Sequence, residues 1–179
     1  INAALRIVGV GEMREIGDIF SQADAQFLET WPLLDHFGER TNTRYLGIAP
    51  MHSDVAPQWL GATEPKVFGY LQDFPGIEQL LRDLQSAGVN ALLFVRDLPP
   101  AIRHAYSSPS LRFVDHLVDL RQVATQVAWA VHHGNHSTMS TFMMAGVPQL
   151  IIPRHQEQLF CTLRLVSAGC AAMAFQDQS

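Results

Sequence analysis

The stretch that decides the fold runs from Val131 to Gln158 and reads VHHGNHSTMSTFMMAGVPQLIIPRHQEQ. A run typical of a β-strand, Val127 to His133, ends at Gly134, and the polar residues Asn135 to Thr138 then open a predicted helix. The apolar face of that helix comprises Met139, Phe142 and Met143. The first backbone N–H groups of a helix have no partner within it and lie at the positive end of its dipole. This strand, turn and helix therefore predict a site for an anion such as phosphate.

A second strand follows the predicted helix and ends close to the same turn. Gln149 to Ile152 is apolar, stops at Pro153 and is followed by Gln156, Glu157 and Gln158. Neighbouring parallel strands present their carboxyl ends at one edge of a sheet. We therefore expect residues 132–138 and 157–158 to lie on one rim.

Outside this stretch, predicted strands alternate with predicted helices. The predicted strands are Val67–Leu71, Ala91–Val95, Leu111–Val114 and Ala171–Phe175. The predicted helices are Ile77–Leu84, Pro99–Tyr106, Leu117–Thr125 and Leu159–Val166. The alternation predicts an α/β fold with a doubly wound parallel sheet, which binds ligands outside the carboxyl ends of its strands.

Three segments with different patterns predict the domain organisation. Residues 1–48 contain two short helical patterns, the second at Ile16–Ala23, and then β-prone runs, and we assign them to the end of another domain. Residues 49–65 hold three prolines and show no periodicity, which is typical of an interdomain linker. Residues 66–179 have the α/β pattern. Because the chain begins at Ile1 within a helical pattern, we expect it to be part of a longer protein.

The composition is that of a globular protein, with 47% apolar and 16% charged residues among 179. A net charge of −5 argues against nucleic acid as a partner. No run approaches the ~20 apolar residues of a transmembrane helix, and no signal peptide is recognisable. Cys161 and Cys170 fit reduced interior residues, which favours the cytoplasm. The excess of Arg over Lys indicates a bacterial source.

These motifs resemble those of the family 1 type of GT-B glycosyltransferases, which includes glucuronosyltransferases, plant secondary-metabolite glycosyltransferases and antibiotic glycosyltransferases. The resemblance rests on HHG at 132–134, the polar turn with Ser137 and Thr138, and AGVPQLIIP at 145–153 followed by Glu157 and Gln158. The pattern AGVPxLxxPxxxxQ is its specific part, because it fixes residues across two elements. The likeness extends less sharply from Lys66 to Phe175.

The resemblance implies a Rossmann-like domain, the C-terminal half of a GT-B enzyme, that binds a nucleotide-diphosphate sugar as co-substrate. The residues that it implies for donor binding are His132, Gly134, Asn135, Ser137, Thr138, Thr141, Glu157 and Gln158. His132 would contact the pyrophosphate, and Glu157 with Gln158 the sugar hydroxyls. The chain departs from the family at Asn135, where a glycine is common, and at Thr141, where a ribose-binding glutamate is frequent.

The resemblance also implies that the base required for transfer lies outside this chain. The base that activates the acceptor, a small molecule or a lipid, is expected in a preceding acceptor-binding domain, so the catalytic residues are unknown. We therefore expect this chain to be one half of a transferase and to show no activity on its own. The resemblance implies neither a further cofactor nor a metal.

Other interpretations of the same residues stay open. Consecutive strand residues point to opposite faces, so His132 and His133 cannot both bind one metal ion. Either could instead be structural, with its N–H bonded to a carbonyl. Glu157 could simply favour the dipole of the helix that it begins. Asp35 and His36 could form an acid–base pair, or Asp35 could cap a turn after Pro32.

Two other functions are compatible with the sequence. One is a non-catalytic GT-B-like binding module, which the departures at Asn135 and Thr141 favour. The other is a GT-B epimerase or hydrolase acting on nucleotide sugars, which would need acid–base carboxylates of its own. The donor base, the sugar and the acceptor are not identified by the sequence.

Overall fold

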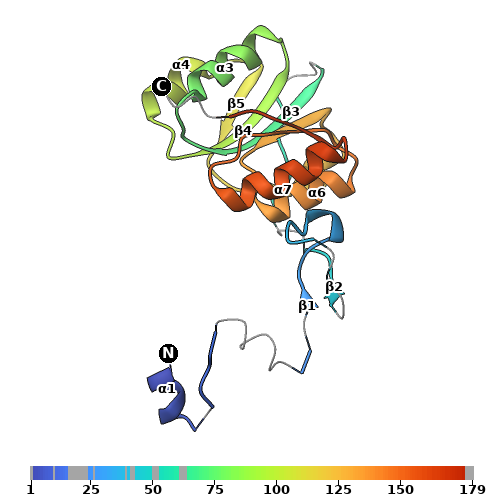
Figure 1. Cartoon of the computed structure of the whole chain (residues 1–179). Coiled ribbons are helices and arrows are strands. Elements are labelled where there is room, and N and C mark those ends of the chain that lie inside the picture. The colour runs from blue at the N-terminus through green and yellow to red at the C-terminus, as the bar shows by residue number, and fades with distance from the viewer. Residues whose placement is uncertain are drawn as a thin grey trace.

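The computed structural model describes residues 2–9, 11–15, 24–25, 27–38, 40, 43–49, 53–60 and 64–175. Six parallel strands in the order β5-β4-β3-β6-β7-β8 form the sheet around which residues 64–175 fold (Figure 1). The strands are β3 Lys66–Gln72, β4 Asn90–Arg96, β5 Leu111–Val114, β6 Trp129–His132, β7 Gln149–Ile151 and β8 Ala171–Met173. The helices between them are α3 Ile77–Ser86, α4 Pro100–Tyr106, α5 Leu120–Ala124, α6 His136–Met144 and α7 Gln156–Ser167.

The predicted doubly wound sheet is confirmed, and each predicted strand and helix of residues 66–175 is present. The predicted helix Leu117–Thr125 begins later, at Leu120, because the Asp119 carboxylate accepts a hydrogen bond from the Arg121 N–H and caps the helix there. Strand β6 begins at Trp129, two residues after the predicted start.

The order of the strands places a switch point between β3 and β6. From β3 the chain first adds β4 and β5 on one side, and then returns to add β6, β7 and β8 on the other side. At such a point the connections leave the sheet in opposite directions, and a crevice opens outside the carboxyl ends of the strands.

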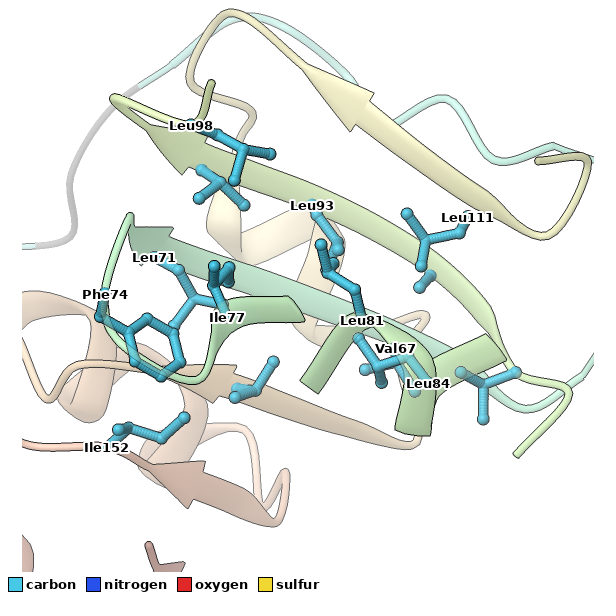
Figure 2. Packing of buried hydrophobic residues seen from close by; sticks show 14 residues of the cluster. Val67, Leu71, Phe74, Ile77, Leu81, Leu84, Leu93, Leu98, Leu111 and Ile152 are labelled. Carbon is cyan, nitrogen blue, oxygen red and sulfur yellow. The ribbon is translucent and has the colours of Figure 1, made fainter. Parts of the chain in front are cut away.

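Helices cover both faces of the sheet. On one face, Ile77, Leu81 and Leu84 of α3 point toward strand residues that include Val67 and Leu71 (Figure 2). The intervening strand residue Phe68 packs on the other face with Phe142 of α6, at 6.2 Å between ring centroids. Side chains of successive β3 residues alternate between the two faces of the sheet and thus contribute to both halves of the core.

The N-terminal part contains α1 Asn2–Ile7, β1 Phe27–Leu28, η1 Pro32–Leu34 and β2 Arg44–Tyr45, with β1 and β2 paired in parallel. The predicted helix at Ile16–Ala23 lies outside the described residues. Figure 1 shows η1 beside α6 and α7. There the fully buried Leu34 packs in a cluster with Met139, Cys161 and Leu165.

The predicted linker contains neither helix nor strand in its described residues 49, 53–60 and 64–65. It packs onto the α/β part: the Val55 carbonyl accepts from the Asp119 N–H at 2.8 Å, and the Trp59 indole donates to Gln126 at 2.8 Å. The division into an acceptor domain, a linker and a donor domain stays a prediction. Among the described residues, no helix has the length and apolar character required to span a bilayer.

Candidate functional site

Two neighbouring cavities lie on the rim that the sequence predicts. The larger, about 410 Å³, opens at the carboxyl ends of four strands, with Gln72 at the end of β3, Arg96 at the end of β4, His133 after β6 and Arg154 after β7. The smaller, about 160 Å³, lies at the start of α6 and α7. Both are lined by Asn135, His155 and Gln158. The larger one spans the switch point between β3 and β6.

The larger cavity has an electropositive lining. Two guanidinium groups, of Arg96 and Arg154, and two imidazoles, of His133 and His155, line it, and no Asp or Glu is present among the lining residues that the structure describes. Asp97, 3.6 Å from Arg96, offsets part of that charge from outside the lining. In the smaller cavity the carboxylate is that of Glu157, an exposed residue. Such a rim attracts an anion, and the two helix dipoles add to the attraction.

Gln158 joins the two parts of the rim. Its side chain is 6% exposed, and its Oε1 accepts a hydrogen bond from the Arg154 N–H at 2.8 Å. Its Nε2 donates to Oδ1 of Asn135 at 3.1 Å. The expected proximity of residues 132–138 and 157–158 is therefore confirmed.

His132 does not present its ring to either cavity. The ring is 0% exposed and lies beside Phe142. Nδ1 accepts from the Gly134 N–H at 2.9 Å, so Nε2 has the proton and donates to Oε1 of Gln149 at 2.9 Å. Burial lowers the pKa of His132 to about 4, and the ring is neutral. Both ring nitrogens already have partners in this structure, so the expected contact of this ring with a pyrophosphate stays a prediction that these hydrogen bonds do not support.

His133, and not His132, lines the larger cavity. It points to the opposite face, edge-on to Phe74, as expected for consecutive strand residues. Nδ1 lies 2.8 Å from the Ile152 carbonyl and Nε2 lies 3.1 Å from the Gln72 carbonyl, so the ring bridges the ends of β3 and β7. The alternation of strand residues was the signal that could have separated the two histidines. No cluster of metal-ligating side chains occurs in the described part of the chain.

The turn between β6 and α6 fits the glycine at its centre. Gly134 has φ +87°, and a Cβ there would lie 3.1 Å from Cγ2 of Ile151 and 3.3 Å from Oγ1 of Thr162. Asn135 is the N-cap residue, so Ser137 and Thr138 fall in the first turn of α6. The Thr138 hydroxyl is buried and has no hydrogen-bond partner among the described residues.

Thr141 lines neither of the two cavities on the rim. Its hydroxyl donates to the Ser137 carbonyl at 2.8 Å. Its side chain borders a third cavity, of about 280 Å³, together with Trp31 and Ile48 of the N-terminal part. The structure thus groups Gly134, Asn135, Glu157 and Gln158 around the two cavities on the rim, whereas His132, Ser137, Thr138 and Thr141 do not line them.

No family model matches the chain. A glycotransferase of kitacinnamycin superposes with a TM-score of 0.75 at 16% identity, over 99% of this chain and 49% of that one. This is the fold of one half of a GT-B glycosyltransferase. The glycosyltransferase SsfS6 of Streptomyces sp. SF2575, complexed with thymidine diphosphate, superposes with a TM-score of 0.64 at 17% identity, over 96% of this chain and 44% of that one.

A sequence match agrees with the GT-B fold. The glycosyltransferase GtfC of Amycolatopsis orientalis is 36% identical over 52 residues, which are 29% of this chain and 13% of GtfC. The chain spans about half the length of the solved glycosyltransferases it matches.

Asp35 and His36 do not form an acid–base pair in this GT-B half. The buried Asp35 carboxylate accepts from the Phe37 N–H at 3.1 Å, from Arg40 at 2.8 Å and from the Tyr45 hydroxyl at 2.8 Å. Burial opposes ionisation, but the Arg40 and Tyr45 hydrogen bonds prevail and lower the pKa of Asp35. The alternative interpretation, a carboxylate that caps a turn, is confirmed.

Proposed function

We propose that the chain binds the nucleoside diphosphate of a nucleotide sugar and is the donor-binding half of a glycosyltransferase. The observation that supports this most is the larger cavity: it opens at the switch point of a GT-B fold, contains two arginines without a carboxylate, and adjoins the N-termini of α6 and α7. Switch points of doubly wound sheets are general ligand sites, and helix N-termini favour phosphate.

The proposal gives each group on the rim a role. The guanidinium groups of Arg96 and Arg154 attract the diphosphate, and the backbone N–H group of Ser137, a partly exposed residue in the first turn of α6, donates to it. Gly134 keeps the turn narrow, so that oxygen atoms approach the backbone. Glu157, in the smaller cavity, accepts hydrogen bonds from sugar hydroxyls.

His132 and Thr141 receive altered roles. The His132 ring fixes the turn through the Gly134 N–H and does not contact the ligand. Thr141 borders the cavity beside Trp31, so we do not assign the ribose to it.

Donor binding contributes to transfer by stabilising the leaving diphosphate. Negative charge builds on that group as the bond to the sugar breaks, and preorganised N–H dipoles and guanidinium groups stabilise it. We propose that the acceptor, a small molecule or a lipid, and the base that activates it engage another part of the whole protein. We accordingly propose turnover for the whole protein. For these 179 residues, donor binding is the property to measure.

Calorimetric titration with thymidine and uridine diphosphates tests the proposal. We expect binding of at least one of them, and a loss of about tenfold in affinity for Arg154→Ala, because a hydrogen bond to a charged group contributes roughly 1.5–3 kcal/mol. Arg82→Ala is the matched control, since it removes the same charge from the exposed surface of α3. Absence of binding by the native chain, or equal losses in both variants, would contradict the proposal.

An epimerase or hydrolase is less compatible with this rim. Acid–base catalysis on the sugar needs titratable groups on both sides of the reacting carbon. Among the described residues that line the two cavities, Glu157 is the single carboxylate. A non-catalytic binding module is separated from a transferase by analysing the products that the whole protein forms from a nucleotide sugar.

A further inference from the structure

His133 lines the larger cavity with both of its ring nitrogens facing acceptors. Nδ1 lies 2.8 Å from the Ile152 carbonyl oxygen, and Nε2 lies 3.1 Å from the Gln72 carbonyl oxygen. A carbonyl oxygen only accepts hydrogen bonds, and a neutral imidazole has a single N–H. A neutral His133 can therefore satisfy one of the two carbonyls, whereas an imidazolium satisfies both.

The two contacts differ, and the difference assigns the proton of the neutral ring. The contact of Nδ1 is the shorter one and is buried, so the N–H is on Nδ1 and donates to the Ile152 carbonyl. Nε2 then directs its lone pair at the Gln72 carbonyl oxygen, in a partly buried contact. Two acceptors that face each other repel. A proton on Nε2 would replace this repulsion with a second hydrogen bond.

The surroundings of the ring oppose that second proton. His133 is 6% exposed, and burial disfavours the charged form of an imidazole. Arg154, after β7, and Arg96, at the end of β4, place positive charge near it. Burial lowers the pKa of His133, the two carbonyls raise it, and the two guanidinium groups lower it again. The net direction is downward, so the ring of the free chain is neutral at pH 7.

The other titratable groups around the ring do not supply negative charge to the cavity. His155 lines the cavity as a further imidazole, and His132, the preceding residue, is buried and neutral. Among the described residues, three carboxylates in the neighbouring segments lie outside the lining of the larger cavity: Asp73, Asp97 and Glu157. An anionic ligand in the cavity is then the group that can favour the imidazolium.

We propose that binding of the diphosphate is coupled to the uptake of one proton by Nε2 of His133. The proton comes from solvent. The imidazolium then donates to both carbonyls, and its charge attracts the phosphates in the cavity that it lines. During transfer the leaving diphosphate gains negative charge and favours the imidazolium further. This inference rests on the proposed function and adds a pH dependence to it.

Calorimetric titration at several pH values tests the coupling. Thymidine diphosphate glucose and uridine diphosphate glucose are the probes, because a diphosphate esterified at both ends has no terminal phosphate that titrates near pH 6. The complex binds one proton more than the free chain, so affinity rises as the pH falls. We expect a rise of about tenfold from pH 7.5 to pH 5.5 for the probe that binds, and buffers of different ionisation enthalpy should reveal the proton uptake.

His133→Gln removes the titrating group and keeps an amide that can donate to one carbonyl. We expect this variant to lose the proton uptake, and the ratio of native to variant affinity to grow about tenfold between pH 7.5 and pH 5.5. A purely structural role of His133 would weaken binding by the same factor at both pH values, which would overturn the inference. His155→Gln is the matched control: proton uptake that disappears there and persists in His133→Gln would also overturn it.

NMR of the ring nitrogens provides a readout on the native chain, which decides even if His133→Gln does not fold. We expect the proton of the neutral ring on Nδ1, and a higher pKa of His133 in the complex than in the free chain. An equal pKa in both would overturn the inference alone, because the ligand is then bound without the proton. If neither thymidine nor uridine diphosphate, nor either glucose ester, binds at any pH, the proposed function fails and the inference fails with it.

Discussion

At the scale of single residues, His132 shows how burial turns an apparent ligand group into a structural one. Its two ring nitrogens are committed to Gly134 and Gln149, with the proton on Nε2. The neutral ring is an acceptor for one neighbour and a donor to the other, which an imidazolium cannot be. Protonation would break the bond to the Gly134 N–H and place a charge in the core.

The first prediction concerns the pH dependence of stability. The pKa of His132 is about 4 in the folded chain and near 6.5 when exposed. Between these values the unfolded chain binds the extra proton. The free energy of unfolding should therefore fall as the pH drops from 6.5 to 4, by roughly 3 kcal/mol from this residue. Urea unfolding of the native chain and of His132→Gln, followed from pH 7 to pH 4, measures the difference.

His132→Gln should be less stable than the native chain at pH 7 and should show a weaker pH dependence. His133 and His136, whose pKa values burial also lowers, remain in both chains and cancel in the comparison. His104→Gln, at an exposed position, provides the control for exchanging a histidine for a glutamine. Parallel curves for the native chain and His132→Gln would contradict the assignment.

The second prediction concerns Gly134. Gly134→Ala should destabilise the chain by roughly 2–4 kcal/mol, because positive φ strains alanine and the new Cβ meets Ile151 and Thr162. Gly88→Ala is matched to it: φ is +65°, but no atom of a described residue other than its chain neighbours lies within 4 Å of a Cβ there. Denaturant unfolding should therefore show a smaller loss, about 1 kcal/mol, at Gly88. Equal losses would mean that the turn at Gly134 does not need the close approach.

At the scale of elements, η1 packs on α6 and α7 and forms one cluster with them. Thr30 bonds His136 at 2.6 Å, the Trp31 indole donates to Ser140 at 2.6 Å, and Arg164 donates to the Leu33 carbonyl at 3.0 Å. The N-terminal part thus contacts the outer side of the two helices whose first turns form the rim.

The third prediction follows from this packing. Leu34→Ala should cost about 2–5 kcal/mol of the free energy of unfolding, since Leu34 is 0% exposed among Met139, Cys161 and Leu165. Leu46→Ala is the control, because Leu46 is 57% exposed and should change stability by less than about 0.5 kcal/mol. If Leu34→Ala has an equally small effect, the N-terminal part does not stabilise α6 and α7 in solution.

At the scale of the whole molecule, the strand order brings four strand ends and two helix starts to one rim. A ligand that binds this rim contacts segments from Gln72 to Gln158 at once. Binding should therefore stabilise the fold of residues 64–175 as a unit, since a ligand that binds the folded state alone shifts unfolding by mass action.

The fourth prediction measures that coupling. Thymidine or uridine diphosphate, whichever binds, should raise the free energy of unfolding by about 2.7 kcal/mol at a concentration one hundred times its Kd. Added salt should weaken the effect, because the attraction to Arg96 and Arg154 is screened. Thermal unfolding with and without ligand provides the measurement, and inorganic sulfate at the same ionic strength is the control. The same shift with sulfate would mean a general anion effect.

The sequence alone determined the order of strands and helices, the parallel sheet and the rim that joins residues 132–138 to 157–158. These follow from local patterns: apolar periods of two and of about four, a glycine at a turn, and polar residues at strand ends. Tertiary structure decided which histidine faces the cavity, where Thr141 lies, and that Gln158 bonds Asn135. Those outcomes depend on contacts between side chains far apart in the chain, such as Thr30 and His136, 106 positions apart. Local periodicity places a residue on a strand or a helix, but only the packing of neighbouring elements decides which partner meets its side chain.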